Sequence, residues 1–192
     1  MRASGILMHT TSLPGPYGIG TMGKAAYEWI DFLKKAGQRY WQILPLNPTG
    51  YGDSPYQSCS AYAGNHYLID LDLLAEQGLL LPEEIAACNW GEDACRVDFG
   101  LQYAFRMKIL RKAYARFRDD GALTEFCSAN ESWISEFALV LELCHTRKLA
   151  EHGEAVEHPS HFGVRRNVRL NVEGVFFGIK TASDVEIGRA HV

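Results

Sequence analysis

Two short apolar runs separated by one amphipathic segment constrain the fold of this chain more than any other feature. The runs are Gly5–His9 (GILMH) and Tyr40–Leu46 (YWQILPL). The first hardly alternates between apolar and polar residues, which indicates a buried strand of the kind found in parallel sheets. The segment between them, Gly23–Gly37, repeats apolar residues at helical spacing and ends in two lysines and a glycine. Strand, helix and strand joined by one crossover predict a parallel βαβ unit.

A loop rich in glycine and proline follows each apolar run. The second loop contains Gly50–Asn65, GYGDSPYQSCSAYAGN, which combines chain breakers with tyrosines and small polar residues. An irregular aromatic loop directly after a buried strand is typical of a ligand site on a barrel scaffold. Tyrosine has a flat apolar face and a polar tip, and both features suit a sugar ring. The alternative is a tyrosine-rich loop with a structural role only.

The rest of the chain is predicted to be mainly helical as far as residue 144. The run Tyr67–Leu74 fits a strand or a helix. Pro82–Ile85 begins a helix, because proline suits the first helical position and two glutamates follow it. Apolar residues at helical spacing predict two further helices, at Leu101–Arg118 and Ser132–Leu143. We therefore expect residues 75–144 to form a helical insertion.

The character of the sequence changes after Cys144. Periodicity fades, and basic and histidine residues accumulate. The last residues, Glu186–Val192 (EIGRAHV), look like a translated sequencing-library adapter. We expect residues 145–192 to be a non-native or out-of-frame tail. A genuine but divergent C-terminus is the alternative.

Composition excludes several classes of partner. The chain has 192 residues, 47% of them hydrophobic, and a net charge of −4. A mildly acidic chain is a poor ligand for nucleic acid, which needs a basic face. No apolar stretch is long enough for a membrane span or a secretory signal, so a cytoplasmic protein is expected. The five cysteines are scattered without a CxxC pair, which indicates reduced thiols. Four histidines cluster without the spacing of metal ligands, so no metal is expected; they are His145, His152, His158 and His161.

Two long segments together resemble one known family. They are Ser4–Gly20 (SGILMHTTSLPGPYGIG) and Trp41–Asn65 (WQILPLNPTGYGDSPYQSCSAYAGN). In this order they closely resemble the N-terminus of the 4-α-glucanotransferases, the amylomaltase or disproportionating-enzyme family (glycoside hydrolase family 77). The resemblance is strong over residues 4–74 and weak over 97–141. It implies an α/β fold in which residues 1–74 form the first βαβ portion of a (β/α)8 TIM barrel. The barrel would be incomplete, because that fold needs about 250 residues.

The resemblance also implies a reaction. Members of the family transfer α-1,4-glucan segments, with retention, from a donor to an acceptor maltooligosaccharide or glucose, and they use no cofactor. Two carboxylates perform such chemistry, and in this family they come from later strands. No catalytic residue falls in a matching motif here, so we expect the chain alone to be inactive. We do not expect the acidic residues that are present to replace the catalytic carboxylates; these are Asp53, Asp70, Asp72 and Asp98. Asp70 and Asp72 are better explained by structural polarity or helix capping.

Three residues match substrate-binding positions of the family. Tyr56, in the tripeptide SPY, matches a tyrosine that stacks on the glucan on the acceptor side of the cleft. Ser54 matches a polar contact in the same loop, and Tyr51 matches a tyrosine of a second glucan-binding surface. Pro55 restricts the backbone before Tyr56 and stiffens the loop. Tyr17 is expected to be a scaffold residue. The alternatives to a glucanotransferase fragment are a non-catalytic glucan-binding module and a functionless truncated reading frame.

Overall fold

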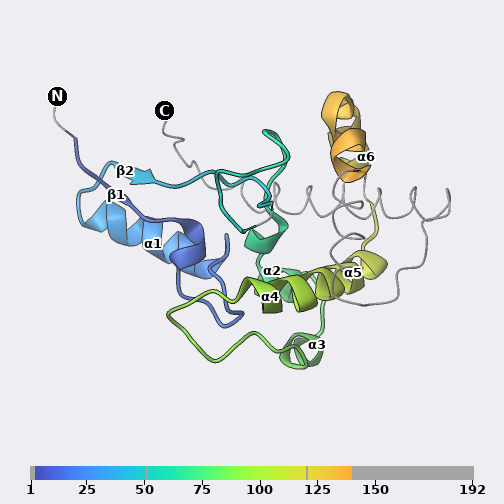
Figure 1. Cartoon of the computed structure of the whole chain (residues 1–192), viewed down its shortest axis with the longest axis horizontal. Helices are drawn as coiled ribbons and strands as arrows, with labels where there is room; N and C mark the ends of the chain where they lie inside the picture. The colour runs from blue at the N-terminus through green and yellow to red at the C-terminus, as the bar shows by residue number, and fades with distance from the viewer. Residues whose placement is uncertain (1–2, 51, 120, 140–192) are drawn as a thin grey trace.

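The computed structural model of the protein describes residues 3–50, 52–119 and 121–139. Its main elements, in chain order, are β1 (Gly5–Leu7), α1 (Lys24–Lys35), β2 (Tyr40–Gln42), α2 (Leu71–Glu76), α3 (Pro82–Ala86), α4 (Phe99–Leu101), α5 (Met107–Arg116) and α6 (Ala122–Ala129). The two strands and α1 lie at one end of the molecule, and α2 to α5 lie together beside them (Figure 1). Helix α6 stands above the C-terminal part of α5 in this view. Residues 131–139 are also helical.

The predicted βαβ unit is confirmed. Strands β1 and β2 pair in parallel, with Gly5 opposite Tyr40 and Leu7 opposite Gln42. The Trp41 indole nitrogen donates to a main-chain carbonyl just past the end of β1, at 2.7 Å. A Cβ atom at Gly5 would lie 2.6 Å from the Tyr40 carbonyl oxygen, so glycine allows the two strands to approach closely.

The strand side chains are not buried, and this part of the prediction is wrong. All three residues of β1 are exposed, and the Leu7 side chain retains 59% of its accessible surface. Within the described ranges the sheet has only these two strands. Apolar side chains on a parallel sheet are buried only when neighbouring strands and helices cover them, and here that cover is partial.

Helix α1 ends as predicted. Gly37 has a φ of 71°, the left-handed conformation that glycine adopts without strain. Its N–H donates to the Lys34 carbonyl, and the N–H of Gln38 donates to the Leu33 carbonyl, at 3.1 and 2.9 Å. This pair of hydrogen bonds is a Schellman motif, which satisfies carbonyls that would otherwise lack a partner at the helix end.

The ambiguous segment after residue 66 is helical. A short 3-10 helix, His66–Leu68, precedes α2. The Asp70 carboxylate accepts a hydrogen bond from the Leu73 N–H at 3.0 Å and caps α2, and its second oxygen accepts the Thr21 hydroxyl. The prediction that Asp70 is a capping residue is therefore confirmed.

Helices α2, α3 and α5 share the main hydrophobic core. Its eight buried members are Ile69, Leu71, Leu74, Leu80, Ile85, Trp90, Ile109 and Ala113. Because α2 belongs to this core, the expected boundary between residues 74 and 75 falls inside a helix that packs on the insertion. After residue 75, the described residues form helices and no strand. The division into domains stays a prediction.

The long helix expected at Leu101–Arg118 is interrupted. A π-helical turn, Gln102–Arg106, separates α4 from α5. It directs two fully buried polar side chains toward the N-terminal half of the chain. The Gln102 amide donates to the Tyr17 carbonyl at 2.6 Å. The Arg106 guanidinium donates to the carbonyls of Tyr67 and Ile69 at 2.6 and 3.1 Å.

Arg106 carries its charge inside the protein. Burial lowers the pKa of its guanidinium to about 10, although the nearby Asp70 raises it. The guanidinium carbon lies 5.7 Å from the centre of the Trp90 ring, a favourable cation–π arrangement. Tyr17 also contacts Trp90 edge-on and donates its hydroxyl to Asp72. These contacts bear out the expectation that Tyr17 is a scaffold residue.

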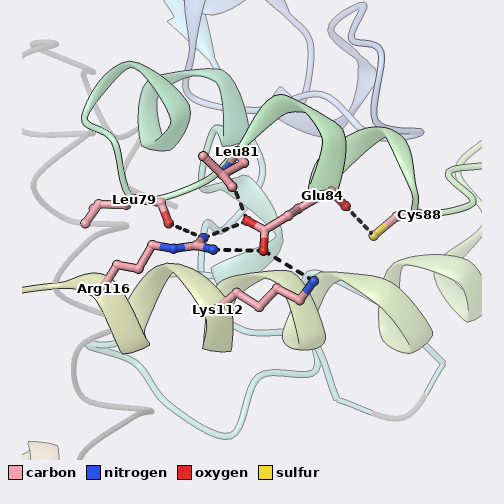
Figure 2. Close-up of polar contacts among 6 residues, drawn as sticks. All are labelled: Leu79, Leu81, Glu84, Cys88, Lys112 and Arg116. Carbon is pink, nitrogen blue, oxygen red and sulfur yellow. Dashed lines mark hydrogen bonds and ion pairs between the residues drawn. The ribbon is translucent and has the colours of Figure 1, made fainter.

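Glu84 joins α3 to α5 (Figure 2). Arg116 donates to both of its carboxylate oxygens, at 2.6 and 2.9 Å, and also to the Leu79 carbonyl at 3.1 Å. The main-chain N–H of Leu81 donates to Glu84 as well, at 3.1 Å, and Lys112 lies 3.5 Å away. The Arg116 hydrogen bonds, followed by that from Leu81, lower the Glu84 pKa to about 2.

Helix α6 has no counterpart in the prediction. It begins after Gly121, whose φ is 100°, and it packs through Leu123 on Ile134 and Ala138. The predicted helix Ser132–Leu143 is confirmed as far as residue 139. Its last residues and the expected tail, residues 145–192, lie outside the described residues.

Candidate functional site

Residues 47–64, called here the pocket loop, leave the scaffold after β2 and return to it at one point. The N–H of Asn65 donates to the Leu46 carbonyl at 2.8 Å, so the two ends of the loop meet. The Asn47 side chain donates to the Ala63 carbonyl at 3.1 Å and joins the same two ends. The Asn65 side chain accepts the Tyr67 N–H at 3.0 Å and begins the next 3-10 helix. The base of the loop is thus fixed.

The tip of the pocket loop is a tight turn that carries Tyr56. Gln57 N–H donates to the Ser54 carbonyl at 3.1 Å and closes the turn, with Pro55 at its second position. Proline presets the backbone angle that this position requires. The Ser54 hydroxyl oxygen accepts the Tyr56 N–H at 3.3 Å. The tyrosine is therefore held through its backbone, and 72% of its surface remains exposed.

Two serine hydroxyls order the second half of the loop. The Ser58 hydroxyl donates to the Ser60 carbonyl at 2.8 Å and accepts the Ser60 N–H at 3.2 Å. The Ser60 hydroxyl oxygen in turn accepts the N–H groups of Tyr62 and Ala63, at 3.2 and 3.1 Å. Serine turns of this kind replace the ladder hydrogen bonds that an irregular segment lacks.

The pocket loop encloses an open pocket of about 350 Å³, lined by Pro45, Asn47, Pro55, Tyr56, Ser58, Cys59, Ser60 and Ala61. The described residues of its lining combine apolar rings with hydroxyl and amide groups, and none of them is a carboxylate, lysine, arginine or histidine. Such a neutral surface, with an aromatic ring at its edge, suits an uncharged ligand that has both apolar faces and hydroxyl groups.

The predicted site residues have different places in this geometry. Tyr56 lines the pocket, whereas Ser54 holds the backbone of Tyr56 and is not part of the lining. Tyr51 lies outside the described residues. The sequence analysis did not single out Asn47 and Ser60. The spacing of the two serines in SCSAY could have identified Ser60 as a residue that orders the loop, because a serine oxygen readily accepts the N–H two residues later.

The described residues contain neither a metal-binding cluster nor a membrane-spanning helix. In the part of the chain that the structure describes, no group of three or more histidine, cysteine, aspartate or glutamate side chains could hold a metal ion. The four clustered histidines, from His145 to His161, lie outside that part. Within the same ranges, no helix combines the length and the apolar character that a membrane crossing needs. Among the described cysteines, Cys88 and Cys95 are free thiols.

Comparison with known proteins decides the family. The family model described as 4-alpha-glucanotransferase matches residues 8–170. The chain belongs to the 4-alpha-glucanotransferase family. The matched range runs beyond residue 144 and so includes part of the segment for which we expected a foreign origin; that expectation stays a prediction.

Relatives of this glucanotransferase family member are similar over most of its length. The 4-alpha-glucanotransferase of Clostridium butyricum is 51% identical over 138 residues, which cover 71% of this chain and 28% of the relative. That of Thermus thermophilus is 48% identical over 74% of this chain and 29% of its own length. The chain therefore spans less than a third of these two relatives.

A solved relative has the same fold. The amylomaltase of Streptococcus agalactiae, determined in complex with acarbose, superposes with a TM-score of 0.79 and is 35% identical. The match covers 96% of this chain and 40% of that protein. The fold of this family member is therefore that of a part of an amylomaltase.

Proposed function

We propose that the chain supplies the acceptor side of a glucan-binding cleft, with maltooligosaccharides and other α-1,4-glucans as ligands. The observation that carries the proposal is the exposed ring of Tyr56, held by a closed turn at the edge of a neutral pocket. A sugar ring can stack on such a face while its hydroxyl groups bond to serine and amide groups. In this proposal Ser54 adds a polar contact from the same turn, and Tyr51 belongs to a second glucan surface.

The position of the pocket in the fold supports this assignment. We propose that β1, α1 and β2 are the first βαβ portion of a (β/α)8 barrel. In such barrels the binding site lies at the carboxyl ends of the strands. The pocket loop begins shortly after the carboxyl end of β2. The expected helical insertion, residues 75–144, would then support the loop from the side.

We further propose that the parent activity is retaining transfer of α-1,4-glucan segments in the cytoplasm, without a cofactor, and that this chain alone does not perform it. Retaining transfer needs two carboxyl groups about 5–5.5 Å apart across the glycosidic bond. Among the residues that the structure describes, the pocket lining contains no carboxylate. The pocket can therefore hold an acceptor sugar, but its own residues cannot form a glycosyl intermediate.

Calorimetric titration with maltotriose tests the binding. Replacing Tyr56 with alanine removes the stacking face, and affinity should fall about tenfold, as expected for roughly 50 Å² of lost apolar contact. Tyr40→Ala is the matched control, because Tyr40 is a similarly exposed tyrosine on β2 and is not part of the pocket lining. Equal affinities of Tyr56→Ala and the unaltered chain would contradict the proposal.

Incubation with maltotriose tests the absence of turnover. Transfer of a maltosyl unit between two maltotriose molecules yields glucose and maltopentaose together. We expect neither product from the folded chain. If both form, a complete retaining site exists within this chain. Binding without turnover agrees with the proposal and also describes a non-catalytic glucan-binding module, the second candidate function.

A further inference from the structure

An aromatic pair with one exposed ring, that of Tyr62, lies beside the pocket. The rings of Tyr62 and Trp133 are stacked, with centroids 5.9 Å apart and planes inclined by 24°. One face of Tyr62 rests on Trp133, yet 69% of the tyrosine surface remains accessible. The accessible part must therefore include the outer face of the ring. A large aromatic ring that is supported on one side and exposed on the other is a ready stacking surface.

The ring that supports Tyr62 is itself fixed. The Trp133 indole N–H donates to the Asn130 side-chain oxygen at 3.0 Å, and the Asn130 amide donates to the Phe126 carbonyl at 2.8 Å. Trp133 also packs against Phe137, which is buried, with ring centroids 6.2 Å apart. Tyr62 thus rests on a tryptophan anchored to α6 and to the helical residues that follow it. The Trp133 side chain therefore has little conformational freedom to lose when a ligand binds to the pair, and this favours affinity.

The aromatic pair is continuous with the pocket. Ser60 lines the pocket, and its hydroxyl oxygen accepts the Tyr62 N–H. Asn47 also lines the pocket and donates to the carbonyl of Ala63, the residue after Tyr62. The backbone that carries Tyr62 is therefore bonded at two points to residues of the pocket wall. A linear ligand that leaves the pocket on this side would pass over Tyr62.

We propose that Tyr62, supported by Trp133, is a second sugar-stacking platform that extends the Tyr56 pocket, so that longer α-1,4-glucans contact both rings. This inference rests on the proposed function, because it assumes that the pocket binds a glucan. In this proposal, the contact between the pocket loop and the helical residues 131–139 determines which chain lengths the protein prefers to bind. Short oligosaccharides occupy the Tyr56 pocket alone, and longer ones gain the second ring.

Comparing a short with a long ligand tests this platform. Maltotriose and maltoheptaose are titrated into the unaltered chain and into the Tyr62→Ala, Tyr62→Phe and Tyr56→Ala variants. We expect Tyr62→Ala to weaken maltoheptaose binding about tenfold and maltotriose binding less than about twofold. Tyr62→Phe keeps the stacking ring and should bind both sugars like the unaltered chain. Tyr56→Ala should weaken binding of both.

The other possible results distinguish failure of the Tyr62 platform from failure of the proposed function. If Tyr62→Ala binds maltoheptaose as tightly as the unaltered chain does, the platform does not exist, while the proposed function stands. If Tyr62→Ala weakens both sugars equally, Tyr62 only supports the pocket loop, and the inference is overturned. If the unaltered chain binds neither sugar, the proposed function fails and the inference fails with it. Thermal melting of each variant confirms that the compared chains are folded.

Discussion

The helical core and the pocket loop hold aromatic and apolar side chains in opposite ways. In the core of α2, α3 and α5, eight buried residues pack on one another. In the pocket loop, Tyr56 and Tyr62 are mostly exposed, and the backbone beneath them is held by hydroxyl and main-chain hydrogen bonds. Order in the first region comes from burial, and order in the second comes from turn chemistry. Substituting an exposed side chain of the loop should therefore change ligand binding while leaving the free energy of unfolding nearly unchanged.

The largest expected effect separates the two regions directly. Leu74 is 1% exposed in the core, and Leu74→Ala should lower the free energy of unfolding by about 2–5 kcal/mol. Tyr56→Ala, which removes a larger but exposed side chain, should change it by less than about 0.5 kcal/mol. Urea denaturation of the two variants measures both values. If both variants lost a similar free energy of unfolding, the loop would be stabilised by its aromatic rings. The proposed difference between the helical core and the pocket loop would then be wrong.

A smaller effect is expected where the two halves of the chain meet. Asp70 caps α2 and accepts the Thr21 hydroxyl, and it also lies near the buried Arg106 charge. Asp70→Ala should lower the free energy of unfolding by about 1–2 kcal/mol, mostly through the lost cap. Asp70→Asn keeps a capping oxygen and serves as the control, so it should lose less. Equal losses would mean that the negative charge beside Arg106 matters more than the cap.

The smallest effect is expected at the surface of the helical core and depends on pH. The pKa of Glu84 lies near 2 in the folded chain, below its ordinary value of 4.5. Its ionised form therefore contributes stability above about pH 4.5, and this contribution is lost as the pH falls toward 2. Glu84→Gln should lower the urea midpoint at pH 7 and differ progressively less from the unaltered chain below pH 4.5. A difference that stays constant from pH 7 to pH 3 would contradict this assignment.

Local patterns were enough to predict much of the fold. The βαβ unit, the glycine that ends α1 and the proline that begins α3 follow from periodicity and from the backbone preferences of single residues. The exposure of β1 does not follow from its own residues, because burial depends on which elements cover a strand. The π-helical turn was also missed. It leaves the apolar spacing of the helix nearly unchanged, and its buried Arg106 and Gln102 find partners only in distant segments.

The candidate site also has one part that the sequence analysis predicted and one part that only the structure revealed. Tyr56 was singled out because it matches a substrate-binding position of the resembled family, and the structure adds that Ser54 and Pro55 form the turn that carries it. Tyr62 stacks on Trp133, which lies far along the chain in another predicted element. No spacing rule relates such positions, so this contact emerged only from the folded structure. The resemblance thus indicated the proposed pocket, whereas the proposed extension over Tyr62 rests on tertiary packing.

The hydrogen bond between Asn65 and Leu46 has a consequence for how this protein can vary. Because the pocket loop departs and returns at one point, residues can be inserted into it without moving the scaffold on either side. Doubling the length of a flexible loop costs only about 0.6 kcal/mol in closure entropy. Insertions in this segment can therefore reshape the pocket while the packing of the helical core is kept.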